Sequence, residues 1–146
     1  MFDFQNISEI LKVQIPLIIS IIAIVISIVA TKKSEDVLTY NSLDKMYTEL
    51  MKVGIDNPDF RNVHKTSNYK SSFEGNRLYA YESYAFMSMN LVATVHDRYK
   101  KTPDTWHNII SHEINLHKYW FADNSAKFKS NFVDFIKHKV LNSKNI

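Results

Sequence analysis

The residues best suited to chemistry are a Glu–His pair in the helix predicted between about residues 103 and 122. His112 and His117 flank Glu113, and the zinc-protease motif also sets a glutamate between two histidines. That motif needs the histidines four residues apart, whereas these are five apart, about 140° around a helix. Glu113 and His117 share a face, but a di-iron bundle requires Glu and His three residues apart, twice. The spacing therefore predicts no metal site, and a solvated or hydrogen-bonded pair instead.

A second group of polar side chains lies on the preceding predicted helix. Glu82, Asn90 and Asp97 fall within about 80° of one another. They form either a solvent-facing strip or a buried network, and buried carboxylates would need partners. The available partners are Arg77, Arg98, His112 and His117. If the stripe is buried, a hydrolase or nuclease could use Glu82, Asp97, Glu113 and His117 as its catalytic residues.

Composition excludes several other classes of site. The chain has no cysteine, which rules out disulfides, thiolate metal ligands and a cysteine nucleophile, and mildly favours the cytosol. The chain has only two glycines, Gly54 and Gly75. So few glycines argue against an all-β fold and against a glycine-rich phosphate loop. No cofactor is expected. The net charge of +3 is far below that of a dedicated nucleic-acid binder.

Residues 13–31 form the clearest element, a run of nineteen residues without a charge. A helix of this length spans about 29 Å, which matches a hydrocarbon core of about 30 Å. A cleaved signal peptide is the alternative, with Ala30 as a cleavage position. A signal peptide starts with positive charge, however, and here Asp3 and Glu9 outweigh Lys12. The segment is therefore predicted to be a transmembrane helix.

The basic residues around this span predict its orientation. Lys32 and Lys33 follow it directly, whereas Lys12 alone precedes it. Because basic residues concentrate on the cytoplasmic side, we expect a single-pass protein of the inner or plasma membrane. Residues 1–12 would lie outside, residues 13–31 would cross the bilayer, and residues 32–146 would form a cytosolic domain.

The cytosolic part is predicted to be all-α, a bundle of about four helices. The first runs from about residue 34 to Val53, and Gly54 ends it. It is either a separate helix or a continuation of the span. Asn57-Pro58 then opens a short helix, and the polar residues 64–75 are interpreted as a loop. The next helix, about 76–101, is apolar nearly all round and is expected to be central. Its main stripe comprises Leu78, Tyr81, Ala85, Met89, Val92, His96 and Tyr99.

Two further helices complete the predicted bundle. Thr102-Pro103-Asp104 supplies the cap, first position and first-turn acid of a helix that breaks at residues 123–125. One face of it carries Trp106, Ile109, Ile110, Glu113, His117 and Trp120. The last helix presents Phe128, Phe132, Phe135, Ile136 and Val140. Short connections between long helices predict antiparallel neighbours.

The C-terminal segment is basic as well as amphipathic. Residues 118–146 hold six lysines against Asp123 and Asp134. Four of these lysines, Lys127, Lys129, Lys137 and Lys139, would be placed to contact anionic lipid headgroups. The favoured alternative is an ordinary bundle helix whose phenylalanines enter the core.

Residues 37–140 resemble a broad group of uncharacterised prokaryotic single-span membrane proteins with a helical cytosolic domain. The resemblance is carried by a tyrosine-bearing first helix, Asp56-Asn57-Pro58-Asp59-Phe60-Arg61, Tyr81-Glu82-Ser83-Tyr84-Ala85-Phe86, Trp106 after its Thr-Pro-Asp restart, and Trp120-Phe121 followed by Phe128 and Phe132. These motifs are structural in character. The resemblance implies a fold and a topology, and no activity.

Three functions remain open from the sequence. The first is a membrane-anchored interaction module that binds a protein partner or self-associates, and it is favoured by the anchor and by the incomplete catalytic sets. The second is the tethered hydrolase or nuclease described above. The third is a membrane-disrupting effector, although the span lacks the intramembrane charge that a conducting path commonly shows.

Overall fold

A computed structural model describes residues 4–99 and 101–142, with side chains from residue 14 to residue 139 apart from residue 100. No strand occurs in these residues, and the all-α prediction is confirmed. The chain divides into two compact units, Met1–Ser42 and Leu43–Ile146. Residues 32–42 thus belong to the first unit rather than to the bundle. The predicted core position Val140 lies outside the described side chains.

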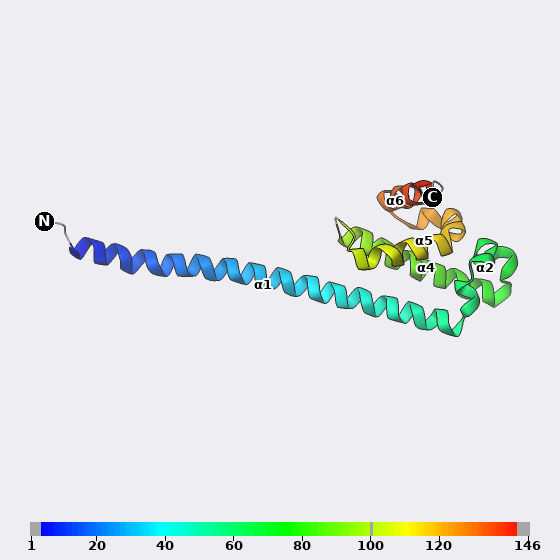
Figure 1. The fold of residues 1–146 in the computed structure, drawn as a ribbon, viewed down its shortest axis with the longest axis horizontal. Helices are drawn as coiled ribbons and strands as arrows, with labels where there is room; N and C mark the ends of the chain where they lie inside the picture. The colour runs from blue at the N-terminus through cyan, green and yellow to red at the C-terminus, as the bar shows by residue number, and fades with distance from the viewer. Residues whose placement is uncertain (1–3, 100, 143–146) are drawn as a thin grey trace. The chain divides into compact units, whose positions relative to one another are not determined.

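The first element is one unbroken helix, α1 (Phe4–Asp56), drawn from blue to green in Figure 1. The helix predicted from about residue 34 is therefore a continuation of the apolar segment and not a separate helix. By length and composition α1 qualifies to cross a membrane, and none of its most apolar window is buried inside the protein. Ser20 donates its hydroxyl to the carbonyl of Pro16 at 2.8 Å, so the polar group is satisfied within the helix.

The prediction that Gly54 ends this helix was wrong, because the helix continues to Asp56. A C-terminal glycine cap has positive φ, and among the described residues only Gly75 has one. Gly54 instead permits a close approach. A Cβ added there would lie 2.6 Å from Cδ of Arg61 and 2.9 Å from the hydroxyl oxygen of Tyr84.

The predicted loop at residues 64–75 was also wrong, since short helices occupy most of it. They are α2 (Val63–Ser67) and α3 (Tyr69–Ser72). The short helix predicted after Asn57-Pro58 precedes them as the 3₁₀ helix η1 (Pro58–Arg61). Asn57 occupies the predicted cap position of η1 but makes no side-chain cap bond. Asn62 caps α2 by accepting from the backbone N–H groups of residues 64 and 65. The segment lacks periodicity because it buries single side chains, among them Thr66, Tyr69 and Phe73.

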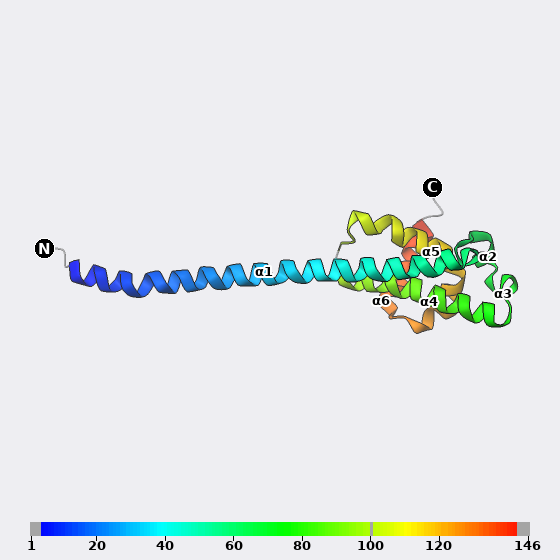
Figure 2. The same cartoon turned by 90° about the horizontal axis from the view of Figure 1, so that it is seen from below.

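Three longer helices complete the bundle: α4 (Gly75–Arg98), α5 (Asp104–Asn124) and α6 (Ser130–Asn142), with the 3₁₀ turn η2 (Ser125–Lys127) before α6. Figures 1 and 2 show α4 and α5 side by side. The cap of α5 is Pro103 rather than the predicted Thr102. The central position of α4 is confirmed, because its buried residues cover several faces: Tyr81, Tyr84, Ala85, Ser88, Met89, Leu91, Val92 and Val95.

The core around α4 is largely aromatic. On one side the ring of Tyr81 stacks on Phe73, with ring centroids 4.6 Å apart. On the other side Phe132 of α6 packs edge-on against Phe121 at 5.7 Å. The last turns of α1 join this core through Leu43 and Leu50, which are both buried. These contacts fix α5 against α4 and so determine which polar side chains meet.

Candidate functional site

Glu113 and His117 lie one turn apart on the face of α5 that enters the core, and both side chains are 0% exposed. Each carboxylate oxygen of Glu113 accepts one hydrogen bond. Oε1 accepts from Nη2 of Arg61 at 3.0 Å, and Oε2 accepts from the hydroxyl of Ser88 at 2.8 Å. The pair is therefore hydrogen-bonded inside the protein rather than solvated.

Arg61 is the partner that sequence reasoning missed. It comes from η1, 52 residues before Glu113, and it passes over the bare backbone of Gly54. Its Nη1 also donates to the hydroxyl of Tyr84 at 2.8 Å. Burial lowers the pKa of Arg61, but the charge of Glu113 and the bond to Tyr84 outweigh it, and the net pKa is raised. The guanidinium therefore stays charged beside the carboxylate.

His117 is buried as a neutral ring. Burial, together with the nearby charges of Arg61 and His112, lowers its pKa to about 3. Its Nδ1 lies 3.2 Å from the hydroxyl of Tyr81, and its Nε2 lies 3.8 Å from Oε2 of Glu113 without a hydrogen-bond partner. A lone pair on Nε2 would face the carboxylate charge, so the favoured tautomer carries its proton on Nε2. Tyr81 then donates to Nδ1.

In the conformation described, this cluster is enclosed by the bundle. The carboxylate of Glu113 has both oxygens engaged, and a general base must reach a substrate proton within hydrogen-bond distance. Removing one partner of a buried ion pair leaves an uncompensated charge, which is strongly destabilising. Arg61, Glu113 and Ser88 therefore connect η1, α5 and α4 at one point, and their clear role is to hold these elements in register.

The other two catalytic candidates lie elsewhere. Asp97 is partly exposed, and it forms an ion pair with Lys129 at 2.6 Å and a contact with His96 at 3.3 Å. Those bonds lower the pKa of Asp97. Asn90 is exposed and Glu82 is half-buried, close enough to Tyr69 to help raise the pKa of its phenol. The stripe is therefore a partly exposed strip and not a buried network.

The four candidate residues are not brought together. Glu113 and His117 are neighbours, whereas Asp97 is paired with Lys129, just before α6, and Glu82 lies towards Tyr69 of α3. Within the described part of the chain, no group of three or more His, Asp or Glu side chains is placed to hold a metal ion.

The lysines proposed to contact lipid are only partly available. Lys129 is paired with Asp97, and Nζ of Lys127 lies 5.4 Å from the ring centroid of Trp120. Lys137 is exposed and Lys139 is half-buried. The apolar face of α6 packs on the bundle through Phe132 and Ile136, so that face is not free to enter a bilayer.

Comparison with protein families, with curated proteins and with solved structures found no match to this chain. A function must therefore be inferred from the chain's own residues and their geometry.

Proposed function

We propose that this protein is anchored in the inner or plasma membrane by residues 13–31 and presents a helical bundle at the cytoplasmic face. The bundle binds a protein partner or a second copy of the chain. One observation carries the anchor: the Ile, Leu and Val side chains between residues 15 and 29 are each 50–63% exposed. Leaving such side chains in water forgoes roughly 1.5–3 kcal/mol of burial energy each, which a bilayer recovers.

Two further features support the anchor and its direction. In lipid every polar backbone and side-chain group needs a partner within the protein, and Ser20 meets this need by bonding to Pro16 of its own helix. The cytoplasmic placement of the bundle rests on Lys32 and Lys33, which follow the apolar segment.

The choice of binding over catalysis rests on where the polar and apolar groups lie. Glu113 and His117 are committed to partners inside the bundle. On α4, by contrast, Tyr79 is 68% exposed, Phe86 41% and Met87 46%. Tyr79 and Phe86 are seven residues apart, so they lie within about 20° of one face. Tyrosine, phenylalanine and methionine are enriched at protein interfaces, and this face is where a partner would dock.

The anchor is tested by charging the span. Full-length protein should stay in the membrane pellet after alkaline extraction, and a reporter fused after Ile146 should be active only as a cytosolic reporter. Ile22→Arg with Ile26→Arg should release the protein, because each arginine costs about 2.5–3.5 kcal/mol at the centre of a span. Ile22→Leu with Ile26→Leu is the matched control. A mature protein that starts at Thr31, or periplasmic reporter activity, would contradict the anchor or its orientation.

The binding role is tested on protein purified from native membranes. We expect a stoichiometric second protein, or a homo-oligomer by mass measurement in a mild detergent. Tyr79→Ser should weaken that association, and Tyr40→Ser, at an exposed tyrosine of the other unit, is the control. A monomer without a stoichiometric companion, both before and after the substitution, would contradict the proposal.

The two alternatives give different outcomes in the same preparations. A tethered hydrolase would lose its phenotype in Glu113→Gln/His117→Asn while keeping its membrane level and its helicity. A membrane-disrupting effector would release dye from phospholipid vesicles. Neither result is expected here, because Glu113 and His117 are enclosed and the span carries no charge.

A further inference from the structure

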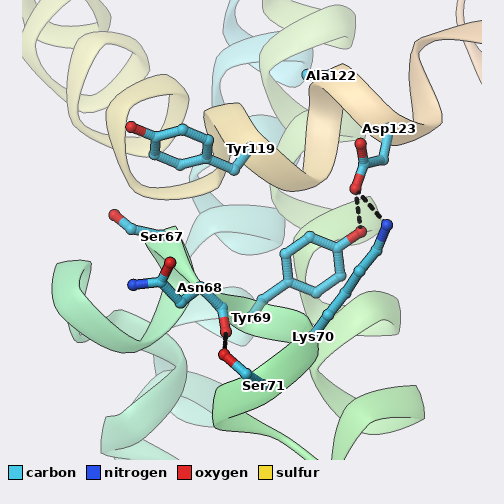
Figure 3. Close-up of a pocket in the computed structure, with 8 residues that line it drawn as sticks. All are labelled: Ser67, Asn68, Tyr69, Lys70, Ser71, Tyr119, Ala122 and Asp123. Carbon is cyan, nitrogen blue, oxygen red and sulfur yellow. Dashed lines mark hydrogen bonds and ion pairs between the residues drawn. The ribbon is translucent and has the colours of Figure 1, made fainter.

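An open groove of about 330 Å³ lies between the α2–α3 junction and the C-terminal half of α5 (Figure 3). Ser67, Asn68, Tyr69, Lys70 and Ser71 form one wall, and Tyr119, Ala122 and Asp123 form the other. The groove belongs neither to the buried Glu113 cluster nor to the exposed face of α4. From the sequence no residue of the groove was predicted to bind a ligand, and Asp123 was noted only at a helix break and among the C-terminal charges.

The charges in the groove cancel. Asp123 accepts from the hydroxyl of Tyr69 at 2.7 Å and from Nζ of Lys70 at 2.8 Å. These two bonds lower the pKa of Asp123, so the carboxylate is ionised and can only accept hydrogen bonds. Both bonds end on Oδ2, which leaves Oδ1 to accept from a ligand. An anionic ligand would meet Asp123 and a cationic one Lys70, so a charged ligand gains little here.

The remaining lining residues offer hydrogen-bonding groups without net charge. The side-chain amide of Asn68 has no hydrogen-bond partner among the described residues, and it can both donate and accept. Ser67 donates to the carbonyl of residue 63 and Ser71 donates to that of Asn68, so both hydroxyl oxygens can still accept. Figure 3 shows the ring of Tyr119 across from Ser67 and Asn68. That ring is 49% exposed and supplies an apolar surface.

We propose that this groove binds a small, uncharged, polyhydroxylated ligand of the size of one saccharide ring. Adjacent hydroxyl groups donate to Oδ1 of Asp123 and to the serine oxygens, and they donate to and accept from the amide of Asn68. The C–H face of the ring packs on Tyr119. The volume lies at the lower end of the about 300–1,000 Å³ seen for small-molecule sites, which fits a ligand of one ring. Because the groove is open, the dissociation constant is expected near 1 mM.

Ala122 and Asn68 make the groove testable without disturbing the core. Both are exposed, and the amide of Asn68 caps neither neighbouring helix by its side chain. Ala122→Phe should fill the hollow, and Ala80→Phe adds the same ring at an exposed alanine of α4, outside the groove. Asn68→Ala removes a hydrogen-bonding group and leaves the volume open.

The experiment is saturation-transfer NMR on the full chain in phospholipid nanodiscs, free of sugar-based detergent. The probes are glucose, galactose, N-acetylglucosamine and myo-inositol, with inorganic phosphate as the charged comparison. We expect at least one of the four uncharged probes to bind, about tenfold more weakly to Ala122→Phe and severalfold more weakly to Asn68→Ala, and equally to Ala80→Phe. If Ala122→Phe fails to fold, Asn68→Ala decides alone. Absence of signal from all four up to about 20 mM, binding of phosphate alone, or binding indifferent to both groove variants would overturn the proposal.

Discussion

The apolar segment of α1 and the centre of the bundle are built in opposite ways. Between residues 15 and 29 large aliphatic side chains point outward and stay more than half exposed. In the bundle a glutamate and a histidine are fully enclosed, and the glutamate keeps an arginine as its partner. Hydrophobicity alone therefore does not tell inside from outside in this chain. The surrounding medium and the available partners decide it.

Each arrangement is stable only under its own condition. Exposed aliphatic side chains are tolerated where the medium is hydrocarbon, and a buried carboxylate is tolerated where every oxygen has a donor. Both regions should consequently be destabilised by an added charge that has no partner. The loss of an ionic partner concerns the bundle, because the Arg61–Glu113 pair lies there.

The largest effect is expected from a charge placed in the centre of α4. Ala85 is 0% exposed and is enclosed by the bundle, so Ala85→Asp buries a carboxylate that has no partner. We expect loss of the folded bundle, measured as loss of the cooperative thermal transition by circular dichroism. Val92→Asp should do the same, and Ala80→Asp on the exposed side of α4 should fold normally. Unchanged melting of both core variants would show that the core lies elsewhere.

Breaking the buried ion pair should have the next largest effect. Glu113→Gln leaves Arg61 without its counter-charge, and removal of one partner of a buried pair typically costs about 3–5 kcal/mol. Arg61 keeps some access to solvent, so we expect the lower part of that range in urea unfolding. Replacing both partners, as Arg61→Met with Glu113→Leu, should recover most of the loss. The solvated or hydrogen-bonded pair predicted from the sequence would tolerate Glu113→Gln with His117→Asn, whereas the burial of both residues predicts a clear loss of stability. Equal stability of all variants would contradict a structural role for the pair.

His117 should make the stability depend on pH in the acid range. Its pKa is lowered to about 3 in the folded state by burial and by the charge of Arg61, against about 6.5 when unfolded. The unfolded chain therefore binds the extra proton between those values, and the free energy of unfolding falls as the pH drops through this window. The contribution reaches about 1.4 kcal/mol per pH unit. In His117→Gln this part of the slope should disappear, and an unchanged slope would mean that the ring is not held neutral.

Gly54→Ala should give a smaller but informative effect. The new Cβ would meet Cδ of Arg61 at 2.6 Å, and overpacking typically costs about 1–3 kcal/mol. Alanine is the better helix former by about 1 kcal/mol, so the net loss should be modest. In a chain that already carries Arg61→Ala, the same substitution should cost less, because only the Tyr84 hydroxyl oxygen at 2.9 Å still has to shift. Equal losses in both backgrounds would show that Arg61 does not need the bare backbone.

The sequence predicted the helices better than the contacts between them. Charge and helical period were enough for the apolar helix, for α4 as the core and for the shared face of Glu113 and His117. The pairing of Arg61 with Glu113 could not be predicted, because Arg61 lies in a short 3₁₀ helix far away in sequence. Its side chain also passes over Gly54, where a larger residue would block it. Residues 64–75 were predicted to be a loop for a related reason. Each of their short helices buries single residues, so the sequence shows no helical periodicity of apolar residues there. The groove depends on Ala122, whose small size carries no signal in sequence.

The most direct test of the membrane anchor uses the absence of cysteine from the chain. Single cysteines at Ser8, Ile22 and Ser130 are treated with a membrane-impermeant maleimide in intact cells and again after permeabilisation. A cytoplasmic bundle on a single span predicts labelling at Ser8→Cys in intact cells, protection at Ile22→Cys in both, and labelling at Ser130→Cys only after permeabilisation. Labelling of Ser130→Cys in intact cells would contradict the orientation, and labelling of Ile22→Cys would contradict the span itself.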